Sequence, residues 1–210
     1  MKTMTRAFAL AGAAMSLYAG AVCVTDSAAL ETSLFSAALP AAQAAEIEAW
    51  RPDIDAATQD DTMAFNVYIG KPIKACVEDF LSKGWKHAPN EPADFYIKKE
   101  KDYIYGVFIR PHVANKDLVG NYSIRFYAKT REMADEMYMR AEKNFSYNFG
   151  RPNVKQGTMN STWFLNDTFS ITVEYNEYDP RMPLVQNYYP YEVAITREMG
   201  DYKKFMVPAK

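Results

Sequence analysis

Cysteine and histidine are both scarce in this chain of 210 residues, which contains two of each. Neither His87 nor His112 has a partner at the spacing of a zinc motif, and the two cysteines are too far apart to form a Cys-x-x-Cys pair. The chain also lacks a Gly-x-Ser-x-Gly elbow, a Walker loop and a Gly-x-Gly-x-x-Gly fingerprint. These absences argue against zinc enzymes, α/β-hydrolases and nucleotide-binding enzymes, and the sequence predicts neither a metal nor a cofactor.

An excess of charge of either sign is also missing. The chain has 24 Lys and Arg against 26 Asp and Glu, which gives a formal net charge of −2. Binding to nucleic acid or to an anionic membrane surface relies on a basic excess. The composition therefore predicts neither partner.

The first residues have the layout of a secretory signal. Lys2 and Arg6 provide a positive start, residues 7–24 are apolar and uncharged, and Ala42-Gln43-Ala44 is a small-residue cleavage pattern. Residues 1–44 are therefore predicted to be a signal peptide. We expect the protein to be exported to the periplasm, the cell envelope or the extracellular space.

Two alternatives to this cleavage remain. Ala19-Gly20-Ala21 is an earlier candidate site, and an uncleaved segment would act as an N-terminal membrane anchor. Cleavage after Ala44 would leave Cys76 as the single cysteine, so an intrachain disulfide would be excluded. An exported protein without disulfides fits a bacterial envelope better than a small eukaryotic secreted module.

Beyond the signal, the chain divides into a weakly patterned part and a strongly patterned part. Residues 45–62 show little periodicity, and we expect a linker or a loosely docked arm held by Trp50. Residues 63–210 are long enough for a single domain with its own core, and their mixture of period-two and helical stripes predicts an α+β fold. The expected strands are 65–69, 95–98, 103–110, 122–127, 163–165, 169–175 and 191–196, and the expected helices lie within 72–84 and 130–150.

The order of these elements recurs along the chain. An offset of 66 residues relates the two central hairpins, so that Tyr103 corresponds to Phe169. We therefore expect two tandem αβββ-type repeats, at about 65–128 and 129–198. Short hairpins favour antiparallel pairing, and two amphipathic helices most simply cover one face of a single curved antiparallel sheet.

The sheet face opposite the helices is the main candidate site. Strand parity places aromatic side chains and arginines there beside small polar groups, a mixture that protein contact surfaces favour. The residues predicted to bind are Tyr96, Phe108, Arg110, Arg125, Tyr127, Phe164 and Glu174. The alternatives are a solvated face without a partner and a face covered by the N-terminal arm. The proline- and tyrosine-rich loop from Asp179 to Tyr191 is a second candidate site.

Residues with catalytic potential are few and isolated. Cys76 lies in an apolar helical stripe between Ile73 and Phe80, and burial keeps a thiol unreactive. Glu174 is a mid-strand carboxylate expected to face away from the helices, and a single carboxylate without a partner near apolar walls is weak evidence for catalysis. No catalytic residue is therefore predicted.

The second repeat contains a helix that ends in Phe149-Gly150-x-Pro152, followed by Trp163 and a hairpin. This pattern resembles the BamE/SmpA family of small envelope lipoproteins, and two such units in tandem resemble the β-lactamase inhibitor protein architecture. The resemblance implies helices that back a curved sheet whose concave face grips a partner. The chain departs from the pattern because it lacks a lipobox cysteine and intrachain disulfides, and because Lys83-Gly84-Trp85 replaces the Gly-x-Pro motif in the first repeat.

Together these features predict an exported bacterial envelope protein that acts as a non-enzymatic protein-binding or scaffold module. Its expected partner is an envelope protein or polymer. The alternative is a hydrolase that acts on cell-wall or glycan substrates, which would need two carboxylates about 5–9.5 Å apart in the sheet concavity. A third hypothesis is a subunit that buries the same face against a second copy of itself.

Overall fold

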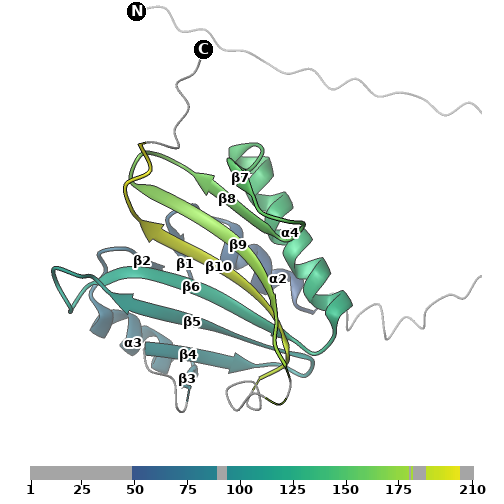
Figure 1. Cartoon of the computed structure of the whole chain (residues 1–210). Helices are drawn as coiled ribbons and strands as arrows, with labels where there is room; N and C mark the ends of the chain where they lie inside the picture. Colours follow the sequence, from purple (N-terminus) through teal and green to yellow (C-terminus); the bar gives the residue numbers. More distant parts are fainter. Residues whose placement is uncertain (1–48, 89–93, 180, 182–187, 204–210) are drawn as a thin grey trace, which may run out of the picture. The chain divides into compact units, whose positions relative to one another are not determined.

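A computed structural model describes residues 49–88, 94–179, 181 and 188–203 of the chain (Figure 1). These residues form three helices, a large antiparallel sheet and a small two-stranded sheet, so the predicted α+β class is confirmed. The helices are α2 (Arg51–Thr58), α3 (Ile73–Ser82) and α4 (Arg131–Phe149). The strands are β1 (Met63–Ala64), β2 (Val67–Tyr68), β3 (Lys86–His87), β4 (Asp94–Lys99), β5 (Tyr103–Pro111), β6 (Val119–Ala128), β7 (Val154–Lys155), β8 (Asn160–Phe164), β9 (Phe169–Glu177) and β10 (Tyr191–Met199).

The N-terminal segment expected to be a signal peptide, residues 1–44, lies outside the described residues. Among the helices that are described, none has the length and hydrophobicity needed to cross a bilayer.

Two antiparallel meanders meet at the centre of the large sheet. The strand order is β3-β4-β5-β6-β10-β9-β8-β7, so β6 and β10 are the central pair. Their register runs from Tyr191 opposite Ala128 to Glu198 opposite Asn121. Helix α3 precedes the first meander in the chain and α4 precedes the second (Figure 1).

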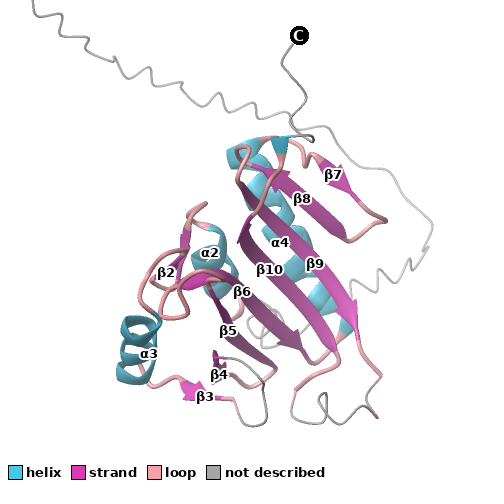
Figure 2. Ribbon diagram, turned by 60° about the vertical axis from the view of Figure 1, so that its left-hand side comes forward, coloured by secondary structure: helices cyan, strands magenta, loops and turns pink. Residues whose placement is uncertain are grey.

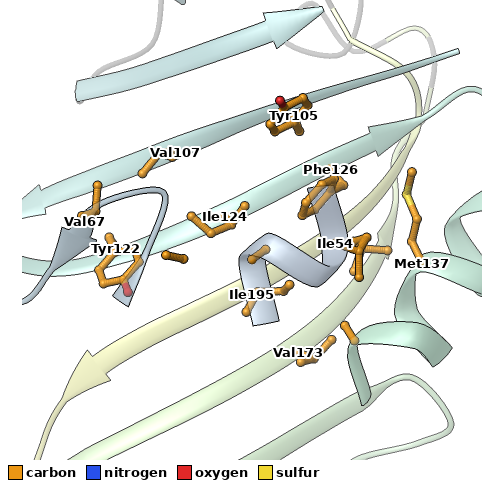
Figure 3. Packing of buried hydrophobic residues seen from close by; sticks show 14 of the residues in the cluster. Ile54, Val67, Tyr105, Val107, Tyr122, Ile124, Phe126, Met137, Val173 and Ile195 are labelled. Carbon is orange, nitrogen blue, oxygen red and sulfur yellow. The ribbon is translucent and has the colours of Figure 1, made fainter. Parts of the chain in front are cut away.

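The main core lies between the helices and one face of this sheet. Helices α2 and α4 contact each other and lie against the strands (Figure 2). Figure 3 shows Ile54 of α2 over the sheet together with Phe126 and Ile195. Cys76 and Phe80 from α3 belong to the same buried cluster. The helices therefore share one side of the sheet, and the face away from them is called the reverse face below.

Helix α2 is a finding that the sequence reading missed. The expected linker or loosely docked arm, 45–62, instead contributes a helix to the core, in which Trp50, Ile54 and Ala57 are buried. Arg197 of β10 fixes the end of this helix, because its guanidinium donates to the carbonyl oxygens of residues 57, 60 and 61 at 2.7–2.8 Å. A cation at a helix C-terminus is favoured by the exposed carbonyls there. On the outer surface, Asp55 accepts two hydrogen bonds from Arg140 of α4.

The segment expected to be one straight strand, 65–69, forms a tight hairpin instead. Phe65 and Asn66 both have positive φ angles, 49° and 63°, and they join β1 to β2. Asparagine tolerates this left-handed conformation and phenylalanine rarely adopts it. The Phe65 ring packs against Trp85 and Tyr105, with centroids 5.5 and 5.7 Å apart, and these contacts offset the local strain.

The two expected helices begin and end near the expected residues. Thr130 caps α4 by accepting a hydrogen bond from the Met133 amide. Gly84 and Gly150, after the ends of α3 and α4, have φ angles of 76° and 77°, a conformation that glycine adopts without steric cost. Pro72, expected from the sequence to be the first helical residue, is instead the N-cap directly before α3.

Candidate functional site

The reverse face divides into an apolar half and a polar half. On β4 and β5 it carries a second hydrophobic cluster, whose buried members are Ala88, Phe95, Ile97, Ile104, Phe108 and Tyr127. Tyr188 and Tyr189 pack over this cluster, and the Tyr188 ring stacks on Tyr127 at 4.7 Å between centroids. We call this group the aromatic patch. Part of the reverse face is therefore covered by the chain's own Tyr188 and Tyr189.

Strand β4 is buried on both faces, and this corrects the position of Tyr96. The sequence prediction placed Tyr96 on the reverse face, but Tyr96 pairs with Val107 and its ring packs against Phe80 of α3 at 5.3 Å. Phe95 faces the reverse side, opposite Phe108. Alternation cannot distinguish the faces of a strand that is apolar on both, so the parity of β4 was assigned wrongly.

A polar pocket of about 250 Å³ lies beside the aromatic patch, over β5, β6, β10 and β9. Its floor is a cross-strand row of hydroxyls, in which Ser123 pairs with Thr196 and Thr196 pairs with Thr172. The row continues to Thr162, whose hydroxyl lies 3.1 Å from that of Thr172. The other side chains that line the pocket are Phe108, Arg110, Asn121, Arg125, Glu174 and Glu198, with Tyr122 adjacent.

Two arginines share one aromatic ring at the edge of this pocket. The guanidinium carbons of Arg125 and Arg110 lie 4.7 and 5.4 Å from the centroid of Phe108. Arg125 also donates from Nε to the Ser123 hydroxyl at 3.2 Å. Arg110 is exposed, and among the described residues it has no ion-pair partner. Cation–π contacts hold both cations at the pocket and leave the N–H groups of Arg110 available.

A buried carboxylate, Glu192, lies where the polar pocket meets the aromatic patch. Its Oε1 accepts hydrogen bonds from Asn176 and from the Tyr178 hydroxyl, both at 3.2 Å, and its Oε2 lies 3.7 Å from Nη1 of Arg125. Burial raises the pKa of Tyr178 to about 12, and the Glu192 charge adds to that effect. Burial is the strongest single influence on the pKa of Arg125 and acts to lower it, but the Glu192 carboxylate together with Tyr127 and Tyr178 outweighs burial, and the pKa is raised. Arg125 therefore stays charged, and its contact with the buried Glu192 holds it in place at the edge of the pocket.

The two glutamates that line the pocket interact with neutral groups. Oε1 of Glu174 accepts from the Asn160 amide at 3.2 Å, and Oε1 of Glu198 accepts from the Tyr202 hydroxyl at 3.1 Å. Within the described ranges, neither glutamate forms an ion pair with Arg110 or Arg125. The pocket thus presents charges of both signs that are not neutralised by one another.

The structure brings together four of the seven residues predicted to bind: Phe108, Arg110, Arg125 and Glu174 line the polar pocket. Tyr127 is on the same face but is buried in the aromatic patch. Phe164 is also on the reverse face, near the sheet edge, where its ring lies 4.9 Å from that of Tyr202.

Sequence reasoning missed Asn121, Ser123, Thr196, Glu198 and Glu192. Ser123 has the same strand parity as Arg125, and Thr196 has the same parity as Ala194, which pairs with Arg125. Parity alone was therefore sufficient to find both. Glu198 was missed because β10 extends to Met199, beyond the strand expected over 191–196.

The cysteine and the two histidines considered in the sequence are each engaged in contacts within the fold. Cys76 is buried in the main core, and burial raises the pKa of its thiol. His87 packs edge-on against Tyr96, and Nδ1 of His112 accepts from the Ala114 amide. The part of the chain that the structure describes contains no group of three His, Cys, Asp or Glu side chains suited to a metal ion. Most of the loop from Asp179 to Tyr191 lies outside the described residues.

A larger hollow of about 550 Å³ lies between α2 and α4. Three charged side chains line it, Asp55, Arg140 and Lys143. Asp55 and Arg140 form a bidentate pair with each other, and Asn144 donates to the same carboxylate. These groups attach α2 to α4. The smaller polar pocket on the reverse face is therefore the stronger candidate site, because its charges are not paired across it.

No protein-family model matches this chain, and no curated protein or solved structure matches it either. Its function is therefore inferred from the geometry of the polar pocket.

Proposed function

We propose that this protein is an exported, non-enzymatic binding or scaffold module of the bacterial envelope, which holds a protein partner at the polar pocket of the reverse face. The observation that carries the proposal is a hollow on a rigid sheet, lined by two arginines and two glutamates that are not paired with each other. Rigid elements lose little entropy on binding, so their contacts contribute efficiently to affinity.

The surroundings of the pocket support a contact surface. The aromatic patch gives it one firm wall at Phe108, and the hydroxyls of Ser123, Thr172 and Thr196 provide donors and acceptors on its floor. Arginine and aromatic side chains are enriched at the energetic centres of protein interfaces. A partner that covers the pocket would bury both kinds of side chain.

The alternative function, a cell-wall or glycan hydrolase, has one observation in its favour. Glu174 and Glu192 are diagonal neighbours on adjacent strands, a placement that separates Cβ atoms by about 7–8 Å. However, Glu192 is only 2% exposed, and its carboxylate is held by Asn176, Tyr178 and Arg125. A general acid must reach the substrate, and this carboxylate faces the protein's own side chains. Binding is therefore the better supported function.

Export is proposed from the N-terminal sequence. Lys2 and Arg6, the apolar run and the Ala42-Gln43-Ala44 pattern support a signal peptide over residues 1–44. N-terminal sequencing of the secreted or periplasmic protein tests this directly. A mature chain that begins at Ala45 is expected, and a chain that retains Met1 would contradict it.

We also propose that the domain arose by tandem duplication, as the resemblance to BamE/SmpA and to the β-lactamase inhibitor protein architecture implies. Three features support this: β4 and β8 begin 66 residues apart, β5 and β9 do too, and the strand order is symmetrical about β6 and β10. The last strands differ in offset. Tyr103 pairs with Ala128 and Phe169 pairs with Met199, so β6 and β10 are related by 71 residues.

Site-specific photo-crosslinking tests the binding proposal. A photoreactive phenylalanine at Thr172, on the pocket floor, is expected to crosslink a partner in the envelope of the producing cell. The same probe at Tyr147, which is 90% exposed beside the α2–α4 hollow, is the matched control and should not. A partner captured from Tyr147 but not from Thr172 would contradict the proposal, and a crosslinked band of twice the monomer mass would support the homo-oligomer instead.

A further inference from the structure

We infer that the polar pocket binds a short peptide segment that has a negative group at one end and a positive group at the other, laid across the strands. This inference rests on the proposed binding function and names the chemistry of the contact. It comes from the order of the charged residues along the cross-strand rows of the reverse face.

Two rows flank the hydroxyl floor, and each runs from an arginine to a glutamate. In one row, Arg125 pairs with Ala194 and Ala194 pairs with Glu174. In the other, Arg110 pairs with Asn121 and Asn121 pairs with Glu198. Both rows therefore have the same polarity, with the positive end over β5 and β6 and the negative end over β10 and β9.

The separation of the charges follows from sheet geometry. Each arginine is two strands away from the glutamate of its row, and neighbouring strands lie about 4.8 Å apart, so the Cα atoms are about 10 Å apart. An extended peptide advances about 3.3–3.6 Å per residue. A segment of two or three residues, with charges at its two ends, spans the space between the side chains.

The size and floor of the pocket fit the same ligand. Its volume of about 250 Å³ is smaller than the roughly 300–1,000 Å³ of drug-sized ligand sites, so it suits a short segment. The hydroxyls of Ser123, Thr196 and Thr172 lie midway between the two rows. Hydroxyls both donate and accept, as the N–H and C=O groups of a peptide require.

The charged ends have groups ready to meet them. Both guanidiniums lie on the Phe108 ring, and the exposed Arg110 keeps its N–H groups to bind a carboxylate. Arg125 already donates to Ser123 and faces Glu192, so it adds positive charge at this end and has fewer free donors. Glu174 and Glu198 accept only from the neutral donors Asn160 and Tyr202 among the residues described, so each keeps its negative charge for a ligand cation.

The bipolar segment has two sources: a free peptide with its own charged termini, or an internal acidic–basic stretch of a folded partner. Two probes distinguish them in titrations followed by two-dimensional NMR on the full mature chain. Trialanine carries charges only at its termini, and the blocked pentapeptide Ac-Ala-Glu-Ala-Lys-Ala-NH₂ carries them only on side chains. We expect either trialanine or the pentapeptide to bind with a Kd of about 1 mM and to change the chemical shifts of the backbone amides that line the polar pocket.

Neutral variants identify the groups responsible. Arg110→Gln and Glu174→Gln are each expected to weaken the binding probe about tenfold, because each removes one charge-assisted contact. Lys116→Gln and Glu100→Gln, at exposed charges outside the pocket, are the matched controls and should leave the Kd unchanged. Arg110 is exposed and Glu174 lines the pocket on the face opposite the main core, so we expect both variants to fold.

The outcomes separate this inference from the proposed function. Binding of trialanine alone assigns the site to free peptides, and binding of the pentapeptide alone assigns it to a segment of a partner. Equal binding of Ac-Ala-Glu-Ala-NH₂, which has no cation, overturns the bipolar ligand. Failure of both bipolar probes also overturns it, even where photo-crosslinking from Thr172 still captures a partner. If no partner is crosslinked from Thr172 but a bipolar probe still binds, the proposed protein partner is wrong and the bipolar ligand stands.

Discussion

The two faces of the large sheet use arginine in opposite ways. On the helix-covered face the inward side chains of the central strands are apolar except for Arg197, which is fully buried and donates to three backbone carbonyls at the end of α2. On the reverse face Arg110 is exposed and contacts only the Phe108 ring among the described residues. An arginine whose Nε and Nη2 already donate to backbone carbonyls stabilises the fold, and an arginine whose donors face a pocket is suited to binding a ligand.

The reverse face is itself divided into a covered part, which serves folding, and an uncovered part, which is available for binding. Its aromatic patch is covered by Tyr188 and Tyr189, whereas the hydroxyls and charges beside it line the polar pocket. Apolar side chains gain free energy from being covered, and charged ones lose their hydration. The composition of each half therefore decides which half is sealed and which is available to a partner.

The largest effect is expected at Arg197. The change Arg197→Met should lower the free energy of unfolding by about 4 kcal/mol, because one buried and two part-buried carbonyls lose their donors at about 1–3 kcal/mol each. Urea denaturation measures this, and Arg110→Gln on the reverse face is the control, with an expected change within about 0.5 kcal/mol. Similar losses for the two variants would abolish the distinction between the faces.

The next effect tests whether the aromatic patch is a true second core. Phe108→Ala should cost about 3 kcal/mol, since Phe108 is 9% exposed and packs against Phe95. Thr172→Ala, on the pocket floor, should cost less than about 1 kcal/mol. A loss below about 1 kcal/mol for Phe108→Ala would mean that the patch contributes little to folding. Phe108 and Arg125 are thus less suitable than Arg110 for testing binding alone.

A smaller effect is expected at the boundary between the two halves. Glu192→Gln should lower the free energy of unfolding by about 1–2 kcal/mol, because Arg125 loses its buried anionic partner. The pKa of Tyr178, about 12 in the wild type, should fall but stay above its usual value of 10, because burial, the larger cause of the rise, remains. Glu198→Gln is the control, and a gain of stability in Glu192→Gln would show that the buried carboxylate opposes folding.

The smallest effect concerns the outer attachment of α2 to α4, and it depends on pH. The Arg140 hydrogen bond lowers the pKa of Asp55 below 3.8 in the folded protein, so the unfolded chain binds more protons as the pH falls. The stabilisation from the Asp55–Arg140 pair is therefore fully present above the ordinary aspartate pKa of 3.8, and it is lost as the pH falls through the lowered pKa of the folded protein. Asp55→Asn should cost less than about 1 kcal/mol at pH 7, as for other exposed pairs, and nothing at the lowest pH. A difference from wild type that grows in acid would contradict this.

Most of the fold was predictable because local signals agreed with the tertiary structure. Thr130 and Gly150 mark the ends of α4, and the short hairpins set the register of β5 and β9. Helix α2 was not predictable in this way. Only Ile54 and Ala57 of its eight residues are fully apolar and fully buried, and its end depends on Arg197, which is distant in sequence.

The candidate site was predictable in outline and not in detail. Arg125 and Glu174 were found by parity because the alternate residues of their strands are clearly apolar. Tyr96 was misplaced because β4 is buried on both faces, which only its pairing with β5 and the contact with Phe80 reveal. The covering of Phe95 and Tyr127 depends on Tyr188, more than sixty residues away in sequence from Tyr127, and strand periodicity does not report such contacts.

Cysteine accessibility measures most directly whether the polar half of the reverse face is available for contact. In a Cys23→Ala background, Thr172→Cys places a thiol on the pocket floor, and native Cys76, which is fully buried, is the internal standard. If the polar pocket is open, a maleimide labels residue 172 rapidly in the folded protein, while Cys76 stays unmodified until denaturant is added. Labelling of residue 172 as slow as that of Cys76 would show that the pocket is covered, and the proposed binding face would be wrong.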